Sequence, residues 1–153
     1  MAGLINELME KLGGMADSVD ALSEFAHAKK DVIINNDVDG LRKITSQENT
    51  LVGRYQKAEK AISEIMKDIA MVLNQNPAGL TLGMLGELIK DQDEHGDYVK
   101  VYDRLKKGIF ELKERNDMNS ALIENALEYI NYTVNAVRST YGTDGDSVLD
   151  TRN

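Results

Sequence analysis

Apolar residues recur at alternating steps of three and four along three long stretches of this chain. The stretches span residues 5–33, 41–72 and 98–137. Steps of three and four place the apolar side chains on one face of an α-helix, where they can pack against another helix. The spacing therefore predicts three long amphipathic helices, and it leaves no stretch for a strand.

Turn-forming residues set the ends of these helices. The stretch "NNDVDG" closes the first hairpin, and either Asp37 or Asp39 is placed to cap the second helix. Pro77 ends the second helix, because proline disfavours the helical conformation at the residue before it. With caps at Thr81 and Asp97, we expect long helices at about 4–34, 38–75 and 97–139, and a short lid helix at about 81–90.

Composition agrees with an all-α fold. The chain has 153 residues, of which 42% are apolar and only 5% aromatic, with one proline and no tryptophan. We expect one domain over residues 1–141, an antiparallel coiled-coil-like bundle of three long helices plus the lid helix. The glycine-bearing tail at 142–153 is expected to be flexible. The pair Gly13-Gly14 costs about 1 kcal/mol per glycine, so the first turns of the bundle could fray or bend there.

Charge and residue content exclude several classes of protein. The formal net charge of -8 opposes binding to phosphate backbones, so no nucleic-acid partner is expected. No segment approaches the roughly 20 apolar residues of a membrane-spanning helix, and the first residues lack the pattern of a signal peptide. The absence of cysteine fits a reducing compartment. We therefore expect a cytoplasmic protein with no stable membrane insertion.

The candidate metal and catalytic motifs are incomplete. The stretch "NNDVDG" resembles the start of a calcium-binding loop, but its twelfth place is Ser46 and Glu48 comes two residues late. Glu24 and His27 have the spacing of a di-iron carboxylate bundle, but His95 cannot complete a second such pair. We expect no metal, no cofactor and no enzymatic activity.

Polar residues interrupt the predicted apolar faces at one level of the bundle. Aligning the helices by their turns brings Glu48 close to Asn116, Asn119 and either Lys29 or Lys30, with Tyr55 at the edge. We predict a structural polar layer from these residues, which would select the register because a buried amide must be paired. Two alternatives remain open: a kink that turns the amides outward, or direct binding of a ligand.

The end of the third helix is apolar on more than one face, which calls for more than one neighbour. One explanation is packing by the lid helix or by a second copy of the chain. The other is a groove for a partner's amphipathic helix. The candidate contact residues are Leu122, Ile123, Leu127, Tyr129, Ile130, Val134 and Val137.

Three stretches together resemble the FlgN-type flagellar export chaperones. They are "KKDVIINNDVDGLRKITSQENTLVGRYQKAEKAI", "ERNDMNSALIENALEYI" and "STYGTDG", which cover about two thirds of the chain. The second stretch is similar to the family's Asn-x-x-Asn signature at Asn116 and Asn119. The third is similar to its terminal tyrosine-glycine stretch, here Tyr141, Gly142 and Gly145. The sequence departs from the family at Gly13-Gly14 and in its glycine-bearing lid helix.

The resemblance implies a small acidic helical chaperone of the bacterial cytoplasm. Such proteins bind the C-terminal helices of flagellar hook-filament junction proteins, prevent their premature assembly, and deliver them to the type III export gate. The resemblance places cargo binding in the C-terminal half and assigns export-gate docking to Tyr141. The alternative is a structural coiled-coil protein that acts through homodimerisation.

Overall fold

The structure is a computed structural model that describes the backbone of residues 1–141 and the side chains of residues 1–120. Over this range all the regular secondary structure is helical and there is no strand, which confirms the predicted all-α class. The elements are α1 (Ala2–Ile34), α2 (Val38–Val72), the 3₁₀ helix η1 (Pro77–Gly79), α3 (Leu82–Leu88) and α4 (His95–Tyr141). The predicted flexible tail at 142–153 lies outside the described residues.

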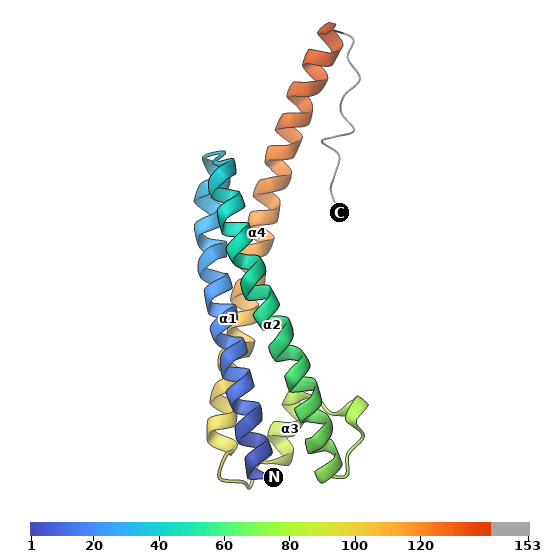
Figure 1. Ribbon diagram of the computed structural model, residues 1–153. Coiled ribbons are helices and arrows are strands. Elements are labelled where there is room, and N and C mark those ends of the chain that lie inside the picture. Colours follow the sequence, from blue (N-terminus) through green and yellow to red (C-terminus); the bar gives the residue numbers. More distant parts are fainter. Residues whose placement is uncertain (142–153) are drawn as a thin grey trace.

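The helices form an elongated bundle in which α1 is the common neighbour. Figure 1 shows α2 returning antiparallel to α1, while α4 runs in the same direction as α1. α1 packs against both α2 and α4, and the short α3 packs on α4 at the end of the bundle where the N-terminus lies. α4 continues as a helix beyond the turn between α1 and α2 (Figure 1).

The helix ends follow local hydrogen bonding. Of the two candidate caps for α2, Asp37 is the one used, since its Oδ1 accepts a hydrogen bond from the Gly40 amide at 2.9 Å. Thr81 Oγ1 caps α3 in the same way, 3.1 Å from the Met84 amide. The prediction that Asp97 caps α4 was wrong: Glu94 O already accepts from the Tyr98 amide, so Asp97 lies inside the first turn.

Other helix ends differ from the expected ones by a few residues. α1 begins at Ala2 and passes through Gly13-Gly14 without a break. α2 stops at Val72 rather than 75, because Asn74 takes a left-handed conformation with φ of 53°. α3 is shorter than the expected lid helix and ends at Leu88.

The hydrophobic core lies mainly at the α3 end of the bundle. There α1 contributes an unbroken series of buried positions in steps of three and four, as its spacing predicted. α2 adds isoleucines from its second half, and Leu85 of α3, Ile89 directly after α3 and Tyr98 of α4 complete the core. The cluster comprises Ile5, Leu8, Leu12, Met15, Ala16, Val19, Ile62, Ile65, Ile69, Ala70, Leu80, Leu85, Ile89, Tyr98 and Leu105.

The face of α4 that meets α1 keeps Leu105 and Asn119 as expected, but Gly108 and Arg115 take the places expected for Ile109 and Asn116. Gly108 and Arg115 face α1, while Ile109, expected in this interface, is 41% exposed. A Cβ atom at position 108 would lie 3.1 Å from Val19 Cγ1, so glycine permits the two helices to approach closely. This arrangement leaves the Ile109 face of α4 directed away from α1.

The two glycine environments predict different effects of the same substitution. Gly14 is exposed, with nothing within 4 Å of an added Cβ, so Gly14→Ala should raise the free energy of unfolding by about 1 kcal/mol. Gly108→Ala gains the same helix propensity but must displace Val19, so it should give a smaller gain or a loss. Urea denaturation compares them, and equal gains at both positions would contradict the close approach at Gly108.

Burial of Tyr98 predicts a loss of stability at alkaline pH. Its hydroxyl donates a 2.6 Å hydrogen bond to Leu82 O and anchors α3, and burial, followed by the charge of Tyr102, raises the pKa of Tyr98. Because the folded pKa is raised, this stability is present below the unfolded tyrosine pKa of about 10 and is lost as pH rises above it. Tyr98→Phe should cost about 1 kcal/mol at pH 7 and flatten the decline between pH 9 and 11. Denaturant unfolding across this range checks it, and parallel curves for both proteins would contradict it.

Candidate functional site

The three long helices enclose a partly polar cavity of about 470 Å³. α1 forms its floor, and α2 and α4 form its two walls. The lining residues are Leu22, Lys29, Glu48, Asn49, Val52, Leu112, Asn116, Asn119 and Ser120. The four residues expected in a polar layer, Lys29, Glu48, Asn116 and Asn119, are thus brought together around one cavity.

An ion pair joins α1 to α2 across this cavity. Lys29 Nζ lies 2.7 Å from Glu48 Oε1, and both side chains are mostly buried, with 18% and 15% exposed. At this degree of burial an unpaired charge would lower the stability of the fold. Each of the two charges therefore offsets the cost of burying the other. The pair leaves this level of the cavity without net charge.

Asn119 joins α4 to α1 beneath the cavity. Its side chain is 4% exposed, and its Nδ2 donates a 2.7 Å hydrogen bond to Ala26 O. One turn earlier, Arg115 Nη1 donates to both Ser23 O and Ser23 Oγ, at 2.8 and 2.9 Å. A carbonyl oxygen has two lone pairs, so a carbonyl within α1 can accept these bonds without losing its place in the helix. The two side chains fix the register of α4 on α1.

Asn116 lies differently from Asn119. Its side chain is exposed and lines the cavity instead of packing between helices. Because Arg115 and Asn119 face α1, Asn116 is directed toward the cavity between α4 and α2. Asn116 is therefore available for contact with a partner.

Tyr55 and Lys30, expected at or near the polar layer, do not line this cavity. Tyr55 is half-buried against the core, where burial, followed by the charge of Glu59, raises its pKa. Lys30 lines a smaller cavity of about 190 Å³ on the other side of the α1–α4 contact, together with His27 and Arg115. Of the two lysines considered, Lys29 is the one paired with Glu48.

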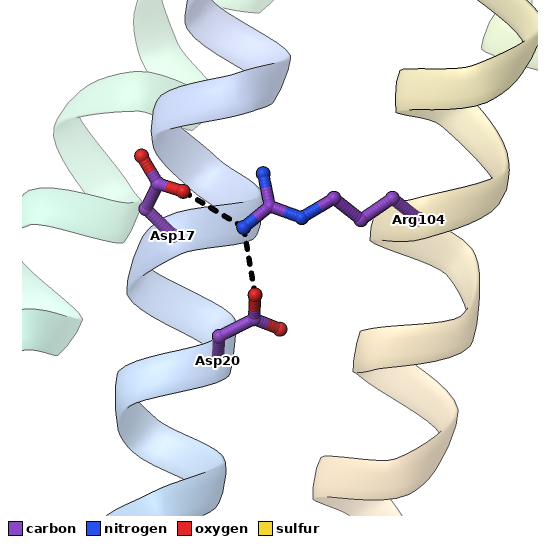
Figure 2. A network of polar contacts seen from close by, with 3 residues as sticks. All are labelled: Asp17, Asp20 and Arg104. Atoms are coloured by element: carbon purple, nitrogen blue, oxygen red, sulfur yellow. Dashed lines mark hydrogen bonds and ion pairs between the residues drawn. The ribbon is translucent and has the colours of Figure 1, made fainter.

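A second polar contact between α1 and α4 lies nearer the α3 end of the bundle. Figure 2 shows Arg104 reaching across from α4 to two carboxylates on successive turns of α1, Asp17 and Asp20. Its Nη2 lies 2.8 Å from Asp17 Oδ1 and 2.7 Å from Asp20 Oδ2, and these hydrogen bonds raise the pKa of Arg104. All three side chains are exposed, so the contact supports the helix pairing by only about 0–1 kcal/mol.

The residues expected to bind cargo lie beyond the described side chains. Residues 121–141 are described only as helical backbone of α4. The positions concerned are Leu122, Ile123, Leu127, Tyr129, Ile130, Val134, Val137 and, for export-gate docking, Tyr141.

Sequence reasoning missed several residues that build the site. Arg115 was not considered as an interface residue, and neither Val52 nor Ser120 was assigned to the cavity. Their signal is weak, because Arg115 and Ser120 lie outside the predicted apolar face of α4 and Val52 lies outside that of α2. Arg104 could have been found from two carboxylates spaced three residues apart on α1, at the level of a single arginine on α4.

The chemistry of the cavity suits recognition of a polypeptide. It offers amides, a hydroxyl, an internally neutralised ion pair and short apolar segments. Within the part of the chain that the structure describes, no group of three or more acidic or histidine side chains is placed to hold a metal ion. In that same part, none of the helices is both long and apolar enough to cross a membrane.

The structure defines an elongated all-α bundle with a partly polar groove between its long helices. The FlgN protein family model matches residues 1–147, so the chain belongs to the FlgN family. This family consists of flagellar export chaperones, which gives the chain a general role in flagellar assembly and flagellar proteins as its partners. No curated protein and no solved structure gives a match.

The two asparagines predict different effects on stability when replaced by alanine. Asn119→Ala removes a buried hydrogen bond and should lower the free energy of unfolding by about 1–3 kcal/mol. Asn116→Ala, one turn away and exposed, should change it by less than about 0.5 kcal/mol. Chemical denaturation of both variants checks this, and equal losses would mean that both amides are structural.

Proposed function

We propose that this chain is a cytoplasmic type III export chaperone for flagellar hook-filament junction proteins. It binds their C-terminal helices, prevents their premature assembly and delivers them to the flagellar export gate. Family membership supports the general role, and the resemblance of the Asn-x-x-Asn and tyrosine-glycine stretches supports the finer one. In this proposal the three long helices and α3 act as a coiled-coil-like scaffold within a single domain over residues 1–141.

The observation that carries the proposal is the length of α4. α4 has 47 residues and α2 has 35, which correspond to about 70 Å and 52 Å of helix. Figure 1 shows the last part of α4 extending past the α1–α2 turn. In sequence, that part is apolar on more than one face, so its apolar side chains need neighbours to pack against. α1 and α2 end before this part of α4 and do not supply them.

A cargo helix is the neighbour that fits this segment best. Cargo contact is assigned to the seven apolar candidates between Leu122 and Val137, and export-gate docking to Tyr141. A helix laid against a helix buries alternating three- and four-spaced apolar residues from both partners, which matches the pattern in "ALIENALEYINYTVNAV".

Co-expression with a junction protein from the same genome tests this function. Size exclusion with light scattering should show a defined soluble complex, which disappears when the junction protein lacks its C-terminal helix. Leu127→Ala with Val134→Ala should weaken the complex at least about tenfold, as expected for removal of two central apolar contacts. Phe110→Ala, which truncates a side chain that is 62% exposed on the same helix, is the matched control and should bind as the wild type does.

Two results would count against the proposal. The absence of any complex, together with a stable homodimer of the chain alone, would favour the structural coiled-coil alternative. A complex that survives removal of the cargo's C-terminal helix would place recognition elsewhere on the cargo.

A further inference from the structure

α3 fills only one end of the space between α2 and α4. It has seven residues, about 10 Å of helix, and it buries Leu85 completely against the core. Two contacts with α4 hold it in place: the hydrogen bond from Tyr98 to Leu82 O, and the packing of Gly83 beside the Tyr102 hydroxyl. α3 therefore shows what this space accepts, which is a helix with apolar residues directed toward the core.

The faces of α2 and α4 on either side of α3 continue past its end. On α2, steps of seven residues lead from Met66, which packs on the core, to Val52, which is 40% exposed and lines the cavity. On α4, the same step leads from Tyr102 beside α3 to Ile109 and then to Asn116. Residues seven apart lie on the same face of a helix. The faces of α2 and α4 that carry Met66 and Tyr102 thus continue, partly exposed, to the polar cavity.

α2 and α4 stand apart on either side of this space. Packed helices lie about 8–10 Å apart. α1 packs directly against both α2 and α4, whereas in the part of the chain described here α2 and α4 have no such contact with each other. A groove therefore runs between them, with Leu22 and Lys29 of α1 on its floor.

We propose that this groove receives an amphipathic helix of the exported partner, packed end to end with α3 as the fourth helix of the bundle. The proposal rests on the proposed function, since it names where the cargo helix continues after it leaves the end of α4. Its apolar residues would lie between Val52 and Ile109. An uncharged polar residue would meet Asn116 at the level of the neutralised Lys29–Glu48 pair.

The charges beside the groove define the flanks of this helix. On α4, Lys106 lies over the Tyr102 ring, with Nζ 6.0 Å from the ring centroid, and Lys113 follows seven residues later on the same face. On α2, the position between Met66 and Val52 is Glu59. The bound helix is therefore acidic on the side that faces α4 and basic opposite Glu59, which fixes its rotation in the groove.

Charge substitutions in the groove test the proposal. Val52→Glu and Ile109→Glu, each made in the full chain, place a carboxylate where the partner helix would bury it. Each should weaken binding of a co-purified junction protein about tenfold or more by calorimetry. Lys113→Glu should weaken binding less, and the loss should shrink as salt is added. Phe110→Glu and Met71→Glu add the same charge to exposed positions outside the groove and should bind as the wild type does.

The fold of each variant is checked by circular dichroism and thermal unfolding, since Val52 and Ile109 are already partly exposed and tolerate a polar side chain. If the wild type binds no junction protein, the proposed function fails. If the wild type binds and both groove variants bind equally well, the proposed function stands, but the cargo helix does not bind in the groove. If the free wild type is a dimer that Val52→Glu separates, the groove binds a second copy of this chain, and the proposal is overturned.

Discussion

The packing of α1 against two helices at once is the constraint on which the rest of the structure depends. α1 buries positions at steps of three and four, and it places small residues such as Ala16, Ser23 and Ala26 beside them. α2 and α4 each pack on α1, and over the described residues they do not pack on each other. The bundle is therefore held together through one central helix, and the space between its two neighbours follows from that arrangement.

The α1–α4 contact sets the register that shapes this space. Gly108 lets the helices approach at Val19, while Arg115 and Asn119 donate hydrogen bonds to carbonyl oxygens within α1. A shift of α4 along α1 would leave these donors buried without partners, so one alignment is strongly favoured. That alignment turns Ile109 and Asn116 toward the groove. The same interactions that stabilise the fold thus expose the residues available for binding.

Under the proposed function, the groove and the long end of α4 together present one extended surface to the cargo helix. α3 already occupies the fourth-helix position at the base of the bundle, and α4 runs past the α1–α2 turn at the other end (Figure 1). A chaperone that holds a helix must offer apolar surface to it and still remain soluble alone. The amides and the Lys29–Glu48 pair meet this need, because they place polar groups in the middle of the groove.

The sequence by itself determined the approximate ends of the long helices, the buried positions of α1, the cap at Thr81 and the choice of Asp37 or Asp39 as the cap of α2, because these depend on local periodicity and local hydrogen bonds. It also brought Lys29, Glu48, Asn116 and Asn119 to one level, since short turns set the alignment of the helices. Only the tertiary structure decided which of two adjacent positions on α4 faces α1. Apolarity favoured Ile109, but the close approach of two helix backbones requires the small Gly108, and this preference exists only once the second helix is in place.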